Sequence, residues 1–275
     1  MDSLLTLPAA NGSAIRILQI TDTHLFAGKH QSLLGVNTWS SFDAVLDAIA
    51  AQQREFDLII ATGDLAQDHS VEAYQHFVAG IARLPKPCVW LPGNHDFQPA
   101  MVDTLAQAGI AADKHVLLGE HWQLVLLDSQ VSGVPHGMLS DYQLEWLERT
   151  LRQFPQRHTL VLLHHHPLAS GCTWLDQHSL RNPHQLAAVL QHFPLARHLV
   201  CGHIHQELDL DWQGRRVLAS PSTCVQFKPH CTNFTIDTVA PGWRWLTLQA
   251  DGALETEVNR LQSEMFRPDL DAEGY

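Results

Sequence analysis

The feature that most limits the fold of this chain is a set of five short, largely apolar runs, each followed at once by polar residues. The runs are rich in Val, Ile and Leu, and they occupy residues 17–20, 58–61, 88–91, 160–163 and 198–201. Continuous apolar runs of this length are typical of strands buried on both faces, as in sheets that helices cover. The sequence therefore predicts an α/β protein whose strands lie in the interior.

The segments between these runs carry the spacing of amphipathic helices. Residues 37–54 and 186–193 place apolar side chains at positions i, i+3, i+4 and i+7, the stripe of a helix packed on a sheet. Residues 141–152 form a third predicted helix, with Ser140 as its candidate N-cap. The alternation of strands and helices from about residue 14 to residue 201 predicts parallel strands joined by helical crossovers.

The pattern changes after Gly202. Short strand candidates follow one another at residues 208–212, 216–219, 223–227, 233–237 and 243–249, with Gly214 as an expected hairpin turn. Antiparallel strands placed after βα units fit a second sheet packed against the first. We therefore expect one domain over residues 1–275, a four-layer α/β/β/α sandwich of two mixed sheets. In this scheme residues 14–205 carry the polar motifs, 206–260 supply second-sheet strands and 261–275 form an irregular tail.

Charge and composition exclude several classes of partner. The chain has 275 residues, with 17 Lys and Arg against 29 Asp and Glu, a formal charge of -12. A surface of this kind does not grip polymeric DNA or RNA through its phosphates, so the attraction of an anionic substrate has to be local, as a metal ion provides. No run approaches the roughly 18 apolar residues of a membrane span, and no basic segment precedes an apolar stretch at the start, which predicts a cytoplasmic protein. No feature of the sequence specifies an oligomeric state.

The cysteines bear on disulfides and thiolate metal sites, and the histidines bear on imidazole metal sites. The five cysteines are odd in number and include no C-x-x-C pair, which argues against a disulfide framework and against a thiolate zinc site. The 19 histidines exceed what two metal ions require, so most are expected to be structural or surface residues. That expectation covers His30, His69, His76, His115, His121, His158, His184, His192, His198 and His230.

The polar residues that follow the five runs are of the kinds that metals coordinate. They read Asp22-Thr23-His24, Gly63-Asp64, Gly93-Asn94-His95-Asp96, His164-His165-His166-Pro167 and Gly202-His203-Ile204-His205. Functional groups collect beyond the carboxyl ends of strands in open α/β sheets, so these residues are expected to share one rim. Carboxylate, amide and imidazole ligands suit Fe(II), Mn(II) or Zn(II), and their number predicts two metal ions.

These five blocks, in this order, resemble those of the calcineurin-like metallophosphoesterases. Residues 35–39, 91–98, 171–182 and 221–230 are similar to the corresponding stretches of the enterobacterial 3',5'-cyclic AMP phosphodiesterases, and the likeness runs nearly end to end. The resemblance implies a metallophosphoesterase-like sandwich that hydrolyses a cyclic nucleotide, 3',5'-cyclic AMP, to 5'-AMP with two divalent ions, Fe(II) or Mn(II) in preference to Zn(II). The alternatives are another phosphoesterase of this fold, such as a nucleotide monoesterase or a glycerophosphodiester hydrolase, and a catalytically silent binding platform.

Carried over residue by residue, the resemblance places Asp22, His24 and His205 on one metal, with Asp64 bridging to the second. Asn94, His164 and His203 hold that second metal. The fourth block differs from the usual His-His-Pro-Pro of the family. Alignment without a gap selects His164, which we prefer, whereas alignment on the proline selects His165; His165 and His166 are otherwise expected to support the ligands or line the pocket.

The expected chemistry is an in-line displacement. Two metals roughly 3.5 to 4 Å apart activate a bridging hydroxide, and no G-x-S-x-G nucleophile motif is present. His95 is the candidate proton donor to the leaving oxygen, while Asp96 orients its ring or serves a structural role. We expect His24, Asp64, Asn94, His95 and His205 to contact substrate. His178, Arg181 and Asn182 contact substrate or form a solvated loop, and Trp174 and Phe227 stack on a base or pack in the protein.

Overall fold

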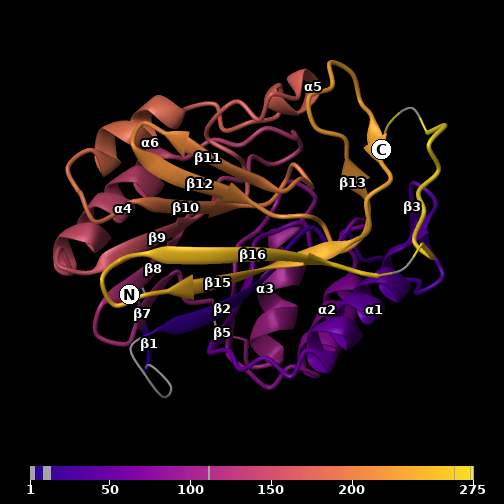
Figure 1. Cartoon of the computed structure of the whole chain (residues 1–275), viewed down its shortest axis with the longest axis horizontal. Coiled ribbons are helices and arrows are strands. Elements are labelled where there is room, and N and C mark those ends of the chain that lie inside the picture. The colour runs from indigo at the N-terminus through magenta and orange to yellow at the C-terminus, as the bar shows by residue number, and fades with distance from the viewer. Residues whose placement is uncertain (1–3, 9–13, 111, 263, 273, 275) are drawn as a thin grey trace.

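The computed structural model describes residues 4–8, 14–110, 112–262, 264–272 and 274, and it is a four-layer sandwich. Two sheets lie face to face, and helices cover the outer face of each (Figure 1). Both sheets contain parallel and antiparallel strand pairs. The predicted α/β/β/α arrangement of two mixed sheets is therefore confirmed.

Among the described residues, the first sheet has five strands. In spatial order these are β16 (Leu254–Arg260), β15 (Gly242–Leu248), β2 (Ile15–Ile20), β5 (Leu58–Ala61) and β6 (Cys88–Trp90). Strands β2, β5 and β6 run parallel, whereas β15 runs antiparallel to β2. The outer face is covered by α1 (Thr38–Ala51), α2 (Val71–Ile81) and α3 (Gln98–Gln107) (Figure 1).

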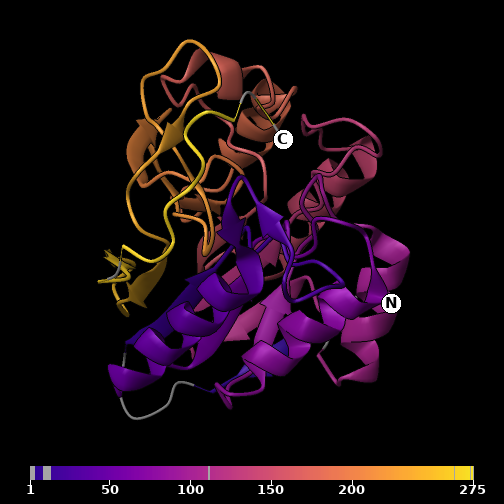
Figure 2. The same ribbon diagram turned by 90° about the vertical axis from the view of Figure 1, so that its right-hand side faces the viewer.

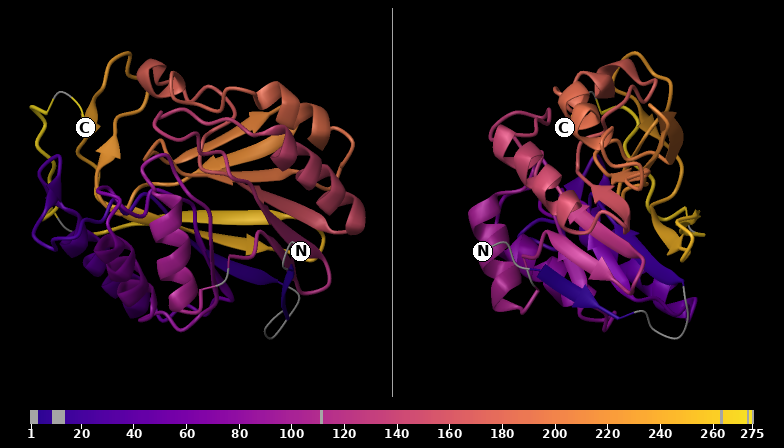
Figure 3. Two further views of the ribbon diagram at one scale, coloured as in Figure 1. Left: turned by 180° about the vertical axis from the view of Figure 1, so that it is seen from behind. Right: turned by 90° about the vertical axis from the view of Figure 1, so that its left-hand side faces the viewer.

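The second sheet has seven strands in the described part of the chain. In spatial order these are β1 (Leu4–Leu7), β7 (His115–Leu118), β8 (Trp122–Leu126), β9 (His158–Leu162), β10 (His198–Cys201), β12 (Arg215–Ala219) and β11 (Leu208–Trp212). Its outer face is covered by α4 (Asp141–Gln153) and α6 (Pro183–Leu190) (Figure 3). The remaining elements are small: β3 (Ser32–Leu33) with β4 (Val36–Asn37), β13 (Gln226–Phe227) with β14 (Ile236–Asp237), and the short helix α5 (Thr173–Asp176).

The strands sort into the two sheets differently from the prediction. The expectation that residues 206–260 supply the second sheet is wrong, because β15 and β16 return to the first sheet beside β2. Only β11 and β12 join the second sheet, which already contains β9 and β10. Apolar periodicity identifies a strand but not the edge it joins, since pairing is decided by contacts far away in the sequence. The described residues of the tail, 261–262, 264–272 and 274, form no helix or strand, as expected.

Local sequence explains where three of the helices begin. Helix α4 begins after Ser140, whose side chain accepts a hydrogen bond from Gln143 N, so the predicted N-cap is confirmed. Asn37 and Ser70 cap α1 and α2 in the same way. Helices α2 and α3 and strands β7 and β8 were not predicted from the sequence. No helix in the described part of the chain is long and apolar enough to cross a lipid bilayer.

The core consists of one apolar cluster between the two sheets and a second cluster beneath the helices, and residues of the two clusters alternate along the strands. Ile17, Ile60 and Leu160 pack between the two sheets, whereas Leu18 and Ile59 face the helices. All five of these side chains are fully buried. Complete burial of a side chain of this size stabilises a protein by about 1.5–3 kcal/mol, so both sheets form a rigid platform for the loops that follow the strands.

The inter-sheet layer becomes polar toward the carboxyl ends of β2 and β10. Arg244 on β15 is 2% exposed and donates to Ala219 O at 2.6 Å, Ser220 Oγ at 3.0 Å and Thr256 Oγ1 at 2.8 Å. Burial lowers the pKa of Arg244 to about 10, which leaves it charged at neutral pH. Gln19 on β2 donates to Cys201 O at the end of β10 at 3.1 Å. These bonds join the two sheets near the loops that carry the polar motifs.

Candidate metal centre

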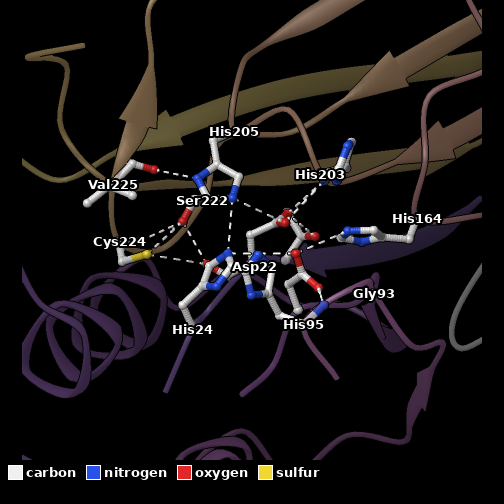
Figure 4. A network of polar contacts seen from close by, with 12 residues as sticks. Asp22, His24, Gly93, His95, His164, His203, His205, Ser222, Cys224 and Val225 are labelled. Atoms are coloured by element: carbon white, nitrogen blue, oxygen red, sulfur yellow. Dashed lines mark hydrogen bonds and ion pairs between the residues drawn. The ribbon is translucent and has the colours of Figure 1, made fainter. Parts of the chain in front are cut away.

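The five polar blocks meet at one end of the sandwich. The first three follow β2, β5 and β6 of the first sheet, and the last two follow β9 and β10 of the second. The sequence suggested a rim on a single sheet, whereas in the structure the rim combines both sheets. Figure 2 is turned so that this end faces the viewer, and Figure 4 shows His24, His164 and His205 directed toward a shared centre around Asp22. All seven predicted ligands lie in this region.

Five of these residues have left-handed backbone conformations. The φ angles are 53° at Asp22, 44° at His24, 51° at Asp64, 71° at His203 and 49° at His205. A residue other than glycine pays roughly 1–2 kcal/mol for this conformation, so it persists only where the surroundings enforce it. Backbone hydrogen bonds between the loops do so here, including Asp22 N to Gly63 O at 3.0 Å and His24 N to Asp64 O at 3.0 Å. Clustered strain of this kind is typical of a functional site.

Asp22, His24 and His205 form a first group of ligand atoms, all within 4.8 Å of one another. Asp22 Oδ1 lies 3.3 Å from His205 Nε2, and His24 Nε2 lies 3.1 Å from the same nitrogen. Each side chain is at most 1% exposed. The peptide N–H of His203 donates to Asp22 Oδ1 at 3.1 Å, and Thr21 Oγ1 donates to Asp22 Oδ2 at 2.6 Å, so the carboxylate is held in place.

A second set of ligand atoms lies beside the first and contacts it through Asp64. Asp64 Oδ2 is 3.2 Å from His164 Nε2 and 3.8 Å from His24 Nε2. Asn94 Oδ1 also lies 3.2 Å from His164 Nε2. His203 belongs to a further group with His164 and His165, and its Nε2 atom is buried with no hydrogen-bond partner among the described residues. Asp64 therefore touches imidazoles on both sides.

The outer nitrogens of three imidazoles fix which ring nitrogen faces the centre. Nδ1 of His24, His164 and His205 lies 2.6, 2.8 and 2.9 Å from Gln67 Oε1, Thr62 O and Val225 O, respectively. Amide oxygens only accept, so Nδ1 carries the hydrogen, and in the neutral ring Nε2 presents a lone pair. The lone pairs of His24 and His205 then face each other at 3.1 Å, an arrangement that repels unless a cation lies between them. The donor set and its geometry fit a metal ion.

The electrostatics of the free protein follow from burial and close charges. Burial acts to raise the pKa values of Asp22 and Asp64, but neighbouring imidazoles, above all His205 and His164, outweigh it and lower both pKa values. Burial lowers the pKa of His24 to about 3. Both carboxylates therefore stay ionised at neutral pH, ready to bind cations.

Comparison with known proteins agrees with this geometry. A sequence model of the calcineurin-like phosphoesterase family matches residues 15–207. The chain belongs to this family. The 3',5'-cyclic adenosine monophosphate phosphodiesterase CpdA of Escherichia coli K12 is 68% identical over 275 residues, the whole of both chains. The protein of the same name from Haemophilus influenzae is 53% identical over 266 residues, 97% of each chain.

The fold is shared with solved structures of distant sequence. A dimetal phosphatase from Danio rerio superposes with a TM-score of 0.58 at 14% identity, over 90% of this chain and 98% of that chain. The metallophosphoesterase-like fold expected from the sequence is thus confirmed. Together, the family and the grouped Asp and His residues identify a site for two metal ions.

The consecutive histidines of this family member have three different surroundings. His164 faces Asp64 and Asn94, as described above. His165 is fully buried, its Nδ1 lies 2.8 Å from Ser129 Oγ, and its Nε2 has no hydrogen-bond partner among the described residues. His166 Nε2 lies 3.2 Å from Asp176 Oδ1. Because His165 is grouped with His164 and His203, both candidates from the two alignments lie at the centre.

Asp96, for which the sequence allowed a structural role, and Gln130, which had no sequence signal, support the third block. The Asp96 carboxylate accepts hydrogen bonds from the peptide N–H groups of Gly93, Leu65 and Ala66 at 2.9, 3.0 and 3.2 Å, which indicates the structural role. Gln130 Nε2 donates to Gly93 O and to Asp96 O, both at 2.6 Å. Gln130 follows β8, a strand that was not predicted, so nothing in the sequence pointed to it.

A cleft of about 360 Å³ opens beside the centre. Asn94, His95 and His203 line one part of it, so the candidate proton donor borders open space. The backbone N–H of His95 donates to Asp64 Oδ1 at 2.8 Å. His69, which was expected to be structural or on the surface, also lines the cleft.

The remaining sequence candidates divide between cleft and scaffold. His178 and Trp174 line the cleft. Asn182 is a scaffold residue, because its side chain bonds to Leu139 N at 3.0 Å and Leu139 O at 2.8 Å. Phe227 is 1% exposed and stacks on His205 with ring centres 4.4 Å apart, so its packing role is the one the structure supports. All five cysteines are free thiols.

Proposed function

We propose that this protein is a metal-dependent phosphodiesterase that hydrolyses 3',5'-cyclic AMP to 5'-AMP. The observation that carries the proposal is the 68% identity with the E. coli phosphodiesterase over every residue of both chains. The grouped Asp and His side chains supply the site that such a hydrolase needs. Fe(II) and Mn(II) are the proposed ions, with Zn(II) as the alternative, because imidazole, carboxylate and amide ligands suit all three.

The proposed ligands divide as the distances suggest. Asp22, His24 and His205 hold one ion, and Asn94, His164 and His203 hold the other. Asp64 is the proposed bridge, supported by its separations of 3.8 Å from His24 and 3.2 Å from His164. His164 is preferred over His165 because its Nε2 faces both Asp64 and Asn94, whereas His165 is grouped only with the other two histidines.

The chemistry divides between the ions and the protein. Two ions held by these residues would polarise the phosphoryl group and would activate water for in-line displacement. Formation of 5'-AMP requires cleavage of the bond between phosphorus and O3′, so O3′ must acquire a proton. His95 is the proposed donor, because it borders the cleft and its main chain is tied to Asp64. His24, Asp64, Asn94 and His205 are the other proposed contacts of the phosphoryl group.

The proposal is tested by comparing three substrates on one preparation loaded with Mn(II). Cyclic AMP, a simple aryl phosphodiester and an aryl phosphomonoester report on nucleotide, diester and monoester turnover, respectively. We expect the highest kcat/KM for cyclic AMP and the lowest for the monoester. A monoester turned over faster than cyclic AMP would replace this proposal with a nucleotide monoesterase.

Two substitutions test the residue roles. Asp64→Ala should abolish hydrolysis and reduce the bound metal, since this carboxylate belongs to both groups. His95→Ala should keep both ions but lose roughly 10²- to 10⁴-fold in kcat, the usual contribution of a general acid. Loss of metal from His95→Ala would contradict the role of proton donor.

A silent binding platform is disfavoured because all seven ligand positions hold competent residues. Elemental analysis after reconstitution with Fe(II) or Mn(II) checks it: fewer than one ion per chain, together with no hydrolysis, would revive that alternative. The cytoplasmic location stays a prediction.

A further inference from the structure

The cleft beside the metal centre has two unlike sides. Asn94, His95 and His203 come from the polar blocks and border the ions' proposed position. Facing the same space are Trp174, Leu175 and Phe234, which come from α5 and from the segment before β14. We refer to Trp174 and Phe234 as the aromatic wall.

Ring contacts connect the aromatic wall to the metal centre. Phe227 stacks on His205 at 4.4 Å with an angle of 17° between the rings. Trp174 meets Phe227 edge to face at 4.9 Å, and Phe234 meets Trp174 edge to face at 5.0 Å. The wall thus has a position fixed relative to a proposed metal ligand.

Hydrogen bonds hold the short helix that carries Trp174. The Asp176 carboxylate accepts from Ser170 N and Ser170 Oγ, both at 2.8 Å, and lies 3.2 Å from His166 Nε2. Thr173 N donates to Cys231 O at 2.9 Å. The wall is therefore built into the scaffold and needs little ordering when a ligand binds, which favours affinity.

The chemistry of the lining indicates what the wall contacts. None of the described residues that line the cleft is Lys, Arg, Asp or Glu. The rings of the aromatic wall carry no charge with which to bind a phosphate, but they suit a neutral planar ring. A volume of about 360 Å³ lies at the small end of ligand pockets, enough for one nucleotide.

We propose that the aromatic wall is the nucleobase side of the cleft and that Trp174, with Phe234, sets the preference for substrates that carry a base. This inference rests on the proposed function, which places the phosphoryl group at the metal centre. The remainder of the nucleotide then extends along the cleft to the wall. The wall contributes to binding of the base and not to the chemical step.

The test compares two substrates that differ only in the base. One is 3',5'-cyclic AMP, and the other is the 3',5'-cyclic phosphate of methyl riboside, in which a methoxy group replaces adenine. Base stacking on an aromatic side chain contributes on the order of 5- to 150-fold in binding. In the full chain loaded with Mn(II), Trp174→Leu should lower kcat/KM for cyclic AMP by that factor, mainly through KM. Turnover of the base-free analogue should change by less than about two-fold.

Three further variants complete the comparison. Phe234→Leu should also lower kcat/KM for cyclic AMP but not for the base-free analogue, by a smaller factor than Trp174→Leu. Trp174→Phe should keep most of the wild-type kcat/KM for cyclic AMP because it keeps an aromatic ring. Trp212→Leu is the matched control: Trp212 is 9% exposed and pairs with Arg215, at the end of the β11–β12 hairpin away from the rim. Trp212→Leu should leave the ratio of kcat/KM for cyclic AMP to that for the base-free analogue unchanged.

Two outcomes overturn the proposal. Equal losses on both substrates in Trp174→Leu would show that the wall only shapes the site, and no loss on either would place the base elsewhere. If the wild-type protein does not hydrolyse cyclic AMP, the proposed function fails by itself. Calorimetric titration with 5'-AMP and ribose 5-phosphate then still tests the role of the aromatic wall. If the wall binds the base, the wild-type protein binds 5'-AMP more tightly than ribose 5-phosphate, and Trp174→Leu removes this difference in affinity.

Discussion

The close approach of two loops at the metal centre predicts that Gly93→Ala inactivates the protein. A Cβ atom on Gly93 would lie 2.6 Å from the carboxyl carbon of Asp64 and closer still to its backbone nitrogen. Because one of the clashing atoms is the backbone nitrogen of Asp64, no side-chain rotation relieves the clash. The two loops would have to separate by about 1 Å, a change that overpacked sites make only at a cost of free energy.

That separation would break the hydrogen bonds that join the loops. His95 N to Asp64 Oδ1 is 2.8 Å, and Leu65 N and Ala66 N lie 3.0 and 3.2 Å from the Asp96 carboxylate. Bonds to a carboxylate contribute about 1.5–3 kcal/mol each, so we expect a loss of about 3–5 kcal/mol in the free energy of unfolding. A displacement of about 1 Å at a catalytic group also costs roughly 100-fold in rate.

The assay combines elemental analysis, kcat/KM for cyclic AMP and thermal unfolding of the same preparation. Gly109→Ala is the matched control, since a Cβ there meets nothing within 4 Å although φ is +74°. It should lose about 1–2 kcal/mol of stability through backbone strain and keep its metal and activity. Wild-type metal content and activity within two-fold in Gly93→Ala would refute the steric reasoning.

Three further predictions concern the supports of the site. Gln130→Met removes two 2.6 Å bonds to Gly93 O and Asp96 O, so kcat should fall about 10-fold or more while KM stays within about three-fold; steady-state kinetics in which only KM changed would contradict this. Arg244→Met leaves buried acceptors unpaired and should cost about 3–5 kcal/mol, a decrease of about 5–10 °C in Tm by scanning calorimetry; an unchanged Tm would argue against the inter-sheet role. Chelation should lower Tm by removing both proposed ions, including the one held by His24 and His205, and Mn(II) should restore it; a Tm insensitive to both would exclude tight metal binding.

The local part of the fold was accessible from the sequence because it depends on neighbours in the chain. Apolar runs gave the strands at residues 58–61 and 198–201 with the bounds that β5 and β10 have, and Ser140 gave the start of α4. Strands β7 and β8 escaped prediction, although both are buried along their whole length.

Ligand types and their order were likewise properties of the sequence, because coordination chemistry depends on side-chain identity. The placement directly after predicted strands indicates that Asp22, Asp64 and the histidines form a metal site. The tertiary structure alone decided how they meet. Strands β2, β5 and β6 belong to the first sheet and β9 and β10 to the second, so the rim combines both sheets. It also decided the surroundings of His164, His165 and His166, and it brought Gln130 and Trp174 to the centre and its cleft. These relations join residues far apart in the chain, and only packing brings such residues together.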